Sequence, residues 1–382
     1  MARANTELYL DHAATTPLRP EARDAMVPYL ERAFGNPSGM HGVSREAKAV
    51  LEDGRERVAA LLGAAHPLDV VFTGGGTESD NLGVAGPSLD SGGGVVISAV
   101  EHEAVLETAT FLGRLGRSVK VIGVDATGLV DPVEVAGAVG PDTAVVSVMT
   151  ANNETGMRQP IRAISAASRE AHPGVLIHTD AVQAFVSEEI TIDALGADLV
   201  TLASHKFGGP KGVGLLHVPR EVSLEPVLHG GGQEMGRRSG THNVAGIVGM
   251  VAAMEAATKD RDRFRTDVTA VRDRFEARLA AAVPEVIFTV PAEQRLIQHS
   301  HFRVPGIDAE TLLIRLDGLG VAAAAGSACH SGALGVSHVL TAMGLDEKAA
   351  RSSVRVSFGW TSRPGDGELA AGAVIECVEA LR

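Results

Sequence analysis

The first half of the chain alternates short apolar runs with longer stretches of helical periodicity. Runs rich in Val, Ile and Leu are predicted to be strands, and they cover residues 70–73, 95–98, 118–124, 143–149, 175–179, 198–202 and 212–218. Most of them are separated by segments of helix length, which is typical of a mainly parallel sheet between layers of helices. The pattern therefore predicts an α/β fold built on a seven-stranded sheet.

After residue 240 the pattern changes to long helices. Two are predicted, at residues 243–258 and 261–282, and the second has an apolar stripe at mostly helical spacing. The stripe consists of Phe264, Val268, Val271, Phe275 and Leu279. Strands at 286–290 and 301–304, a helix at 308–316 and a final helix at 367–381 then predict a smaller α/β domain.

Polar residues at strand ends provide the candidate chemistry. An apolar run ends at Lys206, just before a Gly- and Pro-rich break, and another run delivers Asp180. Ligands of parallel sheets bind at the carboxyl ends of the strands. A lysine amine can form a Schiff base with pyridoxal phosphate, and a carboxylate can keep the pyridine nitrogen protonated. Each residue alone is more simply a loop lysine or a helix cap, so only the pair suggests the cofactor.

Two further strand-to-helix junctions support this hypothesis. Residues 71–81 predict a strand, a glycine turn and a helix start, where backbone N–H groups near Gly76 and Thr77 can bind a phosphate. This segment matches neither a dinucleotide fingerprint nor a Walker loop, so alone it is a weak signal. His102 lies at the second junction, where it could cap the helix or stack on a pyridine ring.

Nine ordered segments together resemble the group I cysteine desulfurases, which are class-V aminotransferase-like members of the fold-type I pyridoxal phosphate enzymes. The segments are 9–16, 35–38, 73–79, 101–102, 152–156, 180–183, 205–206, 238–241 and 326–329. The resemblance spans nearly the whole chain. It implies a large pyridoxal phosphate-binding domain of residues 15–260 and a small domain of residues 1–14 and 261–382. It also implies a homodimer with shared active sites.

The two cysteines of the chain lie in different surroundings. Two cysteines are too few for a disulfide framework, and so low a number is typical of a protein in a reducing compartment. Cys377 lies in an apolar stretch of the final helix, where a cysteine normally behaves as a small hydrophobic residue. Cys329 lies among small and polar residues in a segment expected to be mobile, so its thiol could move between a cofactor and an outside acceptor.

The resemblance also implies residue roles. Lys206, Cys329 and His102 are the implied catalytic residues. The implied cofactor-binding residues are Gly76, Thr77, His102, Asn153, Asp180, Gln183, Ser204, His205, Lys206 and, for the neighbouring subunit, Thr241. L-Cysteine would contact Asn36, Asn153 and Arg355, with the planar fork of Arg355 on its carboxylate. The implied reaction gives L-alanine and a persulfide on Cys329.

Several positions depart from the family pattern. Ala203 stands where a serine usually precedes the lysine, which weakens the expected phosphate contact of Ser204. His299 replaces a common asparagine, His330 follows the cysteine where Thr or Ser is more usual, and Trp360 takes a position often held by Arg or His. The sulfur acceptor stays open: an iron–sulfur scaffold, a tRNA-thiolation protein or another thio-cofactor pathway are the expected classes.

The composition of the chain argues against nucleic-acid-binding and membrane-spanning proteins. The chain has 382 residues, of which 45% are hydrophobic, and a formal net charge of −13. This acidic balance disfavours direct nucleic-acid binding, which depends on clustered Lys and Arg. No apolar stretch approaches the roughly 20 residues of a membrane span, and the start lacks a signal sequence, so we expect a cytoplasmic enzyme.

Three alternatives remain at this stage. A selenocysteine lyase or cysteine sulfinate-type enzyme would share the fold, and Cys329 favours sulfur transfer over both. A small-molecule aminotransferase would need a keto acid and has no use for a mobile thiol. A non-catalytic relative would not be expected to keep Lys206, Asp180, His102 and Cys329 together.

Overall fold

A computed structural model describes residues 8–325 and 336–382, and within them all seven predicted strands form one sheet. They are β2 (Val70–Thr73), β3 (Gly94–Ser98), β4 (Val119–Ile122), β5 (Thr143–Ser147), β6 (Leu176–Asp180), β7 (Leu199–Ala203) and β8 (Gly214–His217). Their order is β2-β8-β7-β6-β5-β3-β4, and β8 runs antiparallel to both neighbours while the other pairs are parallel. The predicted seven-stranded, mainly parallel sheet is therefore confirmed.

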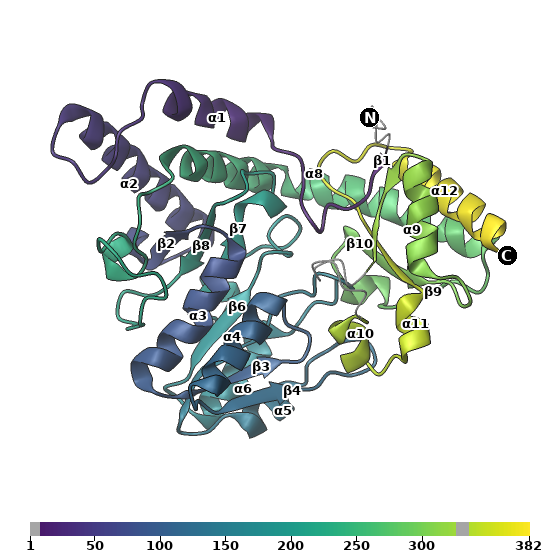
Figure 1. The fold of residues 1–382 in the computed structure, drawn as a ribbon, viewed down its shortest axis with the longest axis horizontal. Coiled ribbons are helices and arrows are strands. Elements are labelled where there is room, and N and C mark those ends of the chain that lie inside the picture. Colours follow the sequence, from purple (N-terminus) through teal and green to yellow (C-terminus); the bar gives the residue numbers. More distant parts are fainter. Residues whose placement is uncertain (1–7, 326–335) are drawn as a thin grey trace.

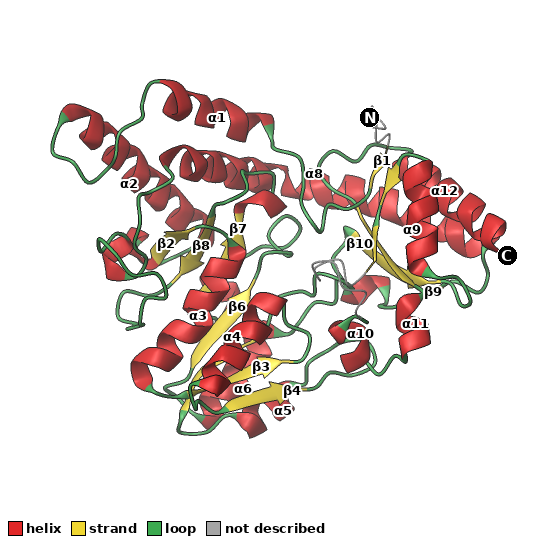
Figure 2. Ribbon diagram, in the orientation of Figure 1, coloured by secondary structure: helices red, strands yellow, loops and turns green. Residues whose placement is uncertain are grey.

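The sheet is buried on both faces because successive strand residues supply two separate cores. On β3, Val95 and Ile97 pack into one cluster while Val96 packs into the other, as the alternation of strand side chains requires. Helices cover both faces (Figure 2). The helices that precede residue 200 are α1 (Pro20–Glu31), which packs on the long helix that follows residue 243, α2 (Gly42–Leu62), α3 (Gly76–Ser91), α4 (Glu103–Arg114), α5 (Pro132–Ala138), α6 (Ile161–Ala171) and α7 (Ile192–Leu195).

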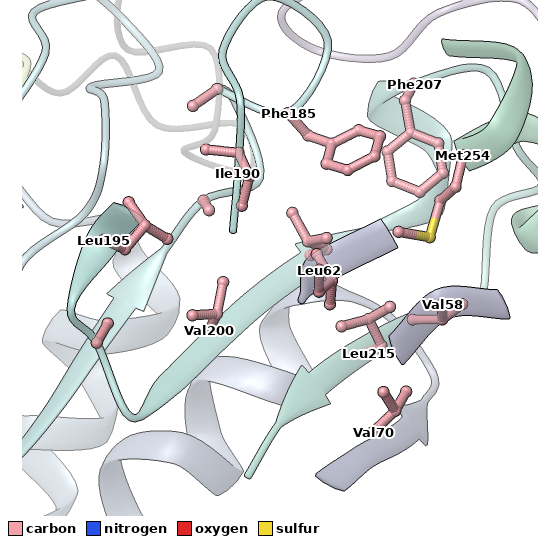
Figure 3. Close-up of a cluster of buried hydrophobic side chains, with 14 of the residues drawn as sticks. Val58, Leu62, Val70, Phe185, Ile190, Leu195, Val200, Phe207, Leu215 and Met254 are labelled. Atoms are coloured by element: carbon pink, nitrogen blue, oxygen red, sulfur yellow. The ribbon is translucent and has the colours of Figure 1, made fainter. Parts of the chain in front are cut away.

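The larger core extends beneath the segment that carries Lys206. Phe185 and Phe207 are fully buried there, with ring centroids 4.9 Å apart, and Met254 packs beside them (Figure 3). Phe207 directly follows Lys206, so its buried ring anchors the chain just beyond the lysine.

The two helices predicted after residue 240 form a single helix, α8 (Val244–Ala282), of 39 residues. The polar residues 258–261 suggest a boundary, but none is Gly or Pro, and nothing there breaks a helix. The first half of α8 packs against the large sheet, and its predicted apolar stripe packs into a second core. Figure 1 shows α8 running from one part of the molecule to the other.

The second core lies on a smaller antiparallel sheet ordered β12-β13-β10-β9. Its strands are β9 (Ile287–Phe288), β10 (His299–Arg303), β12 (Ala324–Ala325) and β13 (Ser353–Ser357). Phe302, Val354 and Val356 face this core, so the alternate residues His301 and Arg355 point to the opposite face.

Helices α9 (Ala309–Gly318) and α12 (Asp366–Leu381) belong to this second part, and β1 (Leu8–Tyr9) pairs in parallel with β11 (Val321–Ala322). Two short helices, α10 (His338–Ala342) and α11 (Glu347–Arg351), precede β13. Residues of α10 pack against Val100, near the end of β3, in a separate small cluster. No helix in the described ranges is long and apolar enough to cross a membrane.

Candidate active site

Lys206 and Asp180 lie at the carboxyl ends of the neighbouring strands β7 and β6. Lys206 closes a short 3-10 turn that starts where β7 ends, and its Nζ donates to the carbonyls of Ala13 at 2.6 Å and Ala14 at 2.9 Å. Asp180 is the last residue of β6, and its Oδ1 accepts from the N–H of Val182 at 2.8 Å. The topology therefore brings the two predicted residues to one edge of the sheet.

The charge state of Asp180 reflects opposing influences. Burial raises the pKa of Asp180, whereas the nearby His102 ring, the hydrogen bond from Val182 and the charge of Lys206 lower it. A cationic partner thus favours the carboxylate form here. A protonated ring nitrogen is a partner of that kind.

Gln183 and His102 lie beside this pair. The Nε2 of Gln183 donates to the carbonyl of Ala13 at 2.9 Å, the same oxygen that Lys206 contacts. His102 caps α4, because its Nδ1 accepts from the N–H of Ala104 at 3.1 Å. The capping interpretation of His102 is therefore correct, and the imidazole also lies close enough to Asp180 to influence the pKa of that carboxyl.

A cavity of about 800 Å³ opens at the N-terminus of α3. Its lining includes the glycine turn Gly74 to Gly76, Thr77, His205 and Lys211. A Cβ added at Gly74 would lie 2.6 Å from Oε2 of Glu78, so the turn has no room for a side chain there. Glu78 holds the turn through the N–H of Gly74 at 2.8 Å and is itself bound by Arg238 at 2.6 Å.

This cavity suits an anionic group such as a phosphate. A helix N-terminus presents backbone N–H groups and the positive end of the helix dipole, and Lys211 adds a positive charge. Burial, followed by the charges of Lys206 and Lys211, lowers the pKa of His205 to about 4. Neutral His205 can still donate one hydrogen bond, and its Nδ1 lies 3.1 Å from Oγ1 of Thr15. The residues present therefore fit pyridoxal phosphate.

Arg355 faces the same region from β13. It is buried, and it donates to the carbonyl of Asn153 at 2.9 Å and to Oδ1 of Asp11 at 2.6 Å. Asn153 lies in the turn that follows β5, so this contact joins the small sheet to the large one. A guanidinium placed in this way can pair with a carboxylate.

The whole chain matches proteins of one family. The family model described as Aminotransferase class-V matches residues 8–366. The chain belongs to the class-V aminotransferase family. It is 39% identical to a cysteine desulfurase IscS of Dictyoglomus turgidum, over 98% of this chain and 95% of that protein. It is 41% identical to a cysteine desulfurase of Gluconacetobacter diazotrophicus, over 94% and 90%. A solved structure described as a NifS-like protein covers 98% of this chain and 99% of its own, with a TM-score of 0.90 and 32% identity.

The other predicted site residues in the described part of the chain differ in burial. Thr241 and Asn36 are exposed, and the amide oxygen of Asn36 accepts from the N–H of Ser38 at 3.0 Å. Ser204 is fully buried, and its hydroxyl packs against Gly209, where a Cβ would lie 2.0 Å from it. Cys329 lies outside the described residues. Cys377 is buried in the second core, as predicted, and burial raises the pKa of its thiol.

Two buried acidic residues near the site of Lys206, Asp180 and Arg355 were not predicted from the sequence. Asp80 of α3 is buried, its Oδ1 lies 3.6 Å from Nε2 of His178, and burial and the charge of Asp180 raise its pKa. Glu154, next to Asn153, accepts from the hydroxyl of Ser337 at 2.6 Å, and burial raises its pKa to about 7. Glu154 lies in a segment that matches the family and Asp80 directly follows one, but an acidic residue in such a segment carries no sequence signal for burial.

Proposed function

We propose that this member of the class-V aminotransferase family is a pyridoxal phosphate-dependent cysteine desulfurase, which converts L-cysteine to L-alanine and passes the sulfur through Cys329. The observation that carries the proposal is the position of Lys206 beside Asp180, next to a glycine-lined helix N-terminus and opposite Arg355. Relatives that match almost end to end are named cysteine desulfurases, which supports the same reaction here.

Residues of six segments would hold the cofactor. Gly76, Thr77 and His205 would bind its phosphate, with Thr241 contributed by the second subunit of a homodimer. Asp180 would pair with the ring nitrogen, Gln183 with the ring hydroxyl, and His102 would cover the ring face, with Asn153 at its edge. Ser204 stays a predicted phosphate contact: its hydroxyl packs against Gly209 and has no hydrogen-bond partner within the described residues. When bound, pyridoxal phosphate supplies an electron sink for bond breaking at the substrate α-carbon.

The side chains of this protein would orient the substrate and move its proton. Arg355 binds the α-carboxylate of L-cysteine, aided by Asn153, and Asn36 stays a predicted further contact. Lys206 then lies where its amine can accept the α-proton and return a proton to product. The carbonyls of Ala13 and Ala14 fix the direction of the lysine side chain, because both accept from Nζ.

Sulfur transfer requires a nucleophile. The thiolate of Cys329 attacks the substrate sulfur, so an S–S bond forms while the Cβ–S bond of L-cysteine breaks. The electron pair of the broken bond stays on the substrate carbon, which takes up a proton and becomes the methyl group of L-alanine. The persulfide on Cys329 then passes its outer sulfur to an acceptor, for which an iron–sulfur scaffold or a tRNA-thiolation protein is the expected class.

We also propose the division into a large domain of residues 15–260 and a small domain of residues 1–14 and 261–382. Support comes from the two cores, since the first half of α8 packs with the large sheet and Leu8, Leu10 and the second half of α8 pack with the small one. The pairing of α10 with the large-sheet side is an exception to a strict division.

The decisive experiment incubates the purified protein with L-cysteine and quantifies alanine and sulfide, with and without a reductant. A desulfurase yields equal amounts of both products in the presence of reductant, because reductant releases the persulfide sulfur. Formation of pyruvate or consumption of a keto acid in place of alanine would contradict the proposal.

A further inference from the structure

His299 is a buried side chain of the cleft that has no role in the mechanism above. It lies on β10 opposite Ser357 of β13, two residues from the His301–Arg355 pair, and therefore on the same sheet face as Arg355. The side chain is 0% exposed. It lines a small cavity together with Lys206, Gln183 and His12.

Both ring nitrogens of His299 lack a hydrogen-bond partner within residues 8–325 and 336–382. The backbone of Asn153 lies near the ring and favours its protonation, but no hydrogen bond of acceptable geometry forms. The Nε of Arg355 is also buried without a partner in the same part of the chain. Buried polar groups are normally satisfied, so two unpartnered groups that face one cleft require an explanation, and a ligand bound between them provides one.

The position of the ring is fixed by its surroundings. The guanidinium of Arg295 donates to the carbonyl of His299. On the other side, a Cβ added at Gly156 would lie 2.7 Å from Cβ of His299, so the turn that carries Asn153 packs directly on this side chain. Gly156 itself has φ 79°, which favours glycine in that turn.

The ring is surrounded by positive charge. Burial, followed by the charges of Arg355, Arg295 and Lys206, lowers the pKa of His299 to about 3. The imidazole is therefore neutral, with one N–H donor and one acceptor nitrogen. A ligand that contacts both Lys206 and Arg355 would lie close to this ring, because the ring lines the same small cavity as Lys206 and shares the sheet face of Arg355.

We propose that His299 is a substrate-binding residue that completes the α-carboxylate site of Arg355 and Asn153 by donating its ring N–H to the carboxylate. This inference rests on the proposed function, because the ligand is an amino acid bound between Lys206 and Arg355. A neutral donor suits this position, since the charges of Arg355, Arg295 and Lys206 oppose a further positive charge on the ring.

The test titrates the visible absorption band of the pyridoxal phosphate-loaded protein with L-alanine and with L-alaninol, which lacks the carboxylate. In His299→Leu the dissociation constant for L-alanine should rise by about tenfold, the effect of one hydrogen bond to a charged group, and that for L-alaninol should stay within about twofold. His299→Gln keeps an N–H donor and should lie nearer the wild type for L-alanine.

Thermal unfolding of the unloaded variants provides a second measurement. His299→Leu should unfold at the wild-type temperature or above it, because an apolar side chain replaces an unpartnered buried imidazole. His301→Leu is the matched control on the same strand. The Nδ1 of His301 lies 2.7 Å from Oγ1 of Thr289, so this variant should unfold at a lower temperature and keep both ligand constants.

Three results would decide against the inference. The dissociation constant for L-alanine could stay unchanged in His299→Leu and rise in Arg355→Lys. That result would exclude His299 from the carboxylate site and leave the proposed function intact. Equal weakening of L-alanine and L-alaninol would show a general packing role. A wild-type protein without a visible band would instead contradict the proposed function itself.

Discussion

The guanidinium of Arg355 donates a 2.6 Å hydrogen bond to Oδ1 of Asp11, which ties strand β13 to the segment after β1. The same segment supplies the carbonyls of Ala13 and Ala14 that accept from Lys206. One stretch of the N-terminal chain therefore contacts both the side chain proposed to bind the substrate carboxylate and the side chain proposed to move its α-proton. An incoming carboxylate meets an arginine that already has a carboxylate partner.

Replacing Arg355 with Lys keeps the positive charge and removes the planar fork. The KM for L-cysteine should rise by an amount that reflects roughly 1.5 to 3 kcal/mol of charge-assisted hydrogen bonding, with normal cofactor content. Initial-rate kinetics give the measurement. Arg351→Lys is the control, because Arg351 forms an exposed ion pair with Glu347 on α11. An unchanged KM in Arg355→Lys would place the carboxylate site elsewhere.

The purified protein should be yellow, since a conjugated imine on Lys206 absorbs visible light. Lys206→Ala should lose the visible band and keep its far-ultraviolet circular dichroism, because the lysine amine donates to backbone carbonyls at the cleft and does not belong to a hydrophobic core. Lys120→Ala, which removes an exposed lysine from β4, should keep the band. A band of unchanged position and intensity in Lys206→Ala would exclude this lysine as the cofactor's attachment point.

Replacing each cysteine with serine should have different effects, because Cys329 is proposed to act in sulfur transfer and Cys377 packs in the second core. Cys329→Ser should still bind the cofactor and respond spectrally to L-cysteine, but it should release almost no sulfide. Cys377→Ser should keep most of its activity and at worst lose stability, because it places a hydroxyl in the apolar second core. Mass spectrometry after brief exposure to L-cysteine should find one extra sulfur on the peptide that contains Cys329. Finding it on Cys377 would overturn the assignment.

Strand positions and the strand-end residues were predictable, because both depend on local pattern. Apolar runs marked all seven strands, and Lys206 and Asp180 followed from the polar ends of two of them. The continuity of α8 was not predicted, since its polar residues 258–261 resemble an interhelical boundary but have ordinary helix propensity.

The polar partners inside the cleft required the structure. Asp11 lies in a segment that matches the family, yet its pairing with Arg355 joins residues 344 positions apart. The burial of Asp80 beside His178 depends on how α3 lies across the sheet, and no periodicity in the sequence encodes that. His299 stood out only as a departure from the family pattern.

Glu234 anchors the loop that precedes α8. Its carboxylate accepts two hydrogen bonds of 2.7 Å from Arg55 and one from the N–H of Phe72 at 3.0 Å, and it lies 2.8 Å from Nε2 of His242. Glu234 and Met235 both have positive φ, at 48° and 58°, which is unfavourable for residues with side chains. The ion pair thus holds a strained turn close to Thr241.

Glu234→Gln should cost about 3 to 5 kcal/mol at pH 7, because it leaves Arg55 buried without its charge partner. Burial alone would raise the pKa of Glu234, but His242 and Arg55 lower it to about 2. The carboxylate therefore stabilises the fold above the ordinary glutamate pKa, and this stability is lost as the pH falls from about 4.5 towards 2. Denaturant unfolding at several pH values measures the effect.

The matched control for that variant is Glu255→Gln, which breaks the half-exposed pair with Arg57. Surface pairs contribute about 0 to 1 kcal/mol, so this change should have little effect at any pH. A gap between wild type and Glu234→Gln that stays constant down to pH 2 would show that charge on Glu234 is unimportant for the turn.

The continuity of α8 has a consequence for how the molecule holds together. At a rise of 1.5 Å per residue its 39 residues extend roughly 58 Å, and the two hydrophobic cores share this one element. If either core unfolded, its half of α8 would lose the side chains that pack against it. The other half would then end in an unsupported helix terminus and would be destabilised as well. The two parts of the chain should therefore unfold cooperatively, and both sides of the cleft should be lost in the same transition.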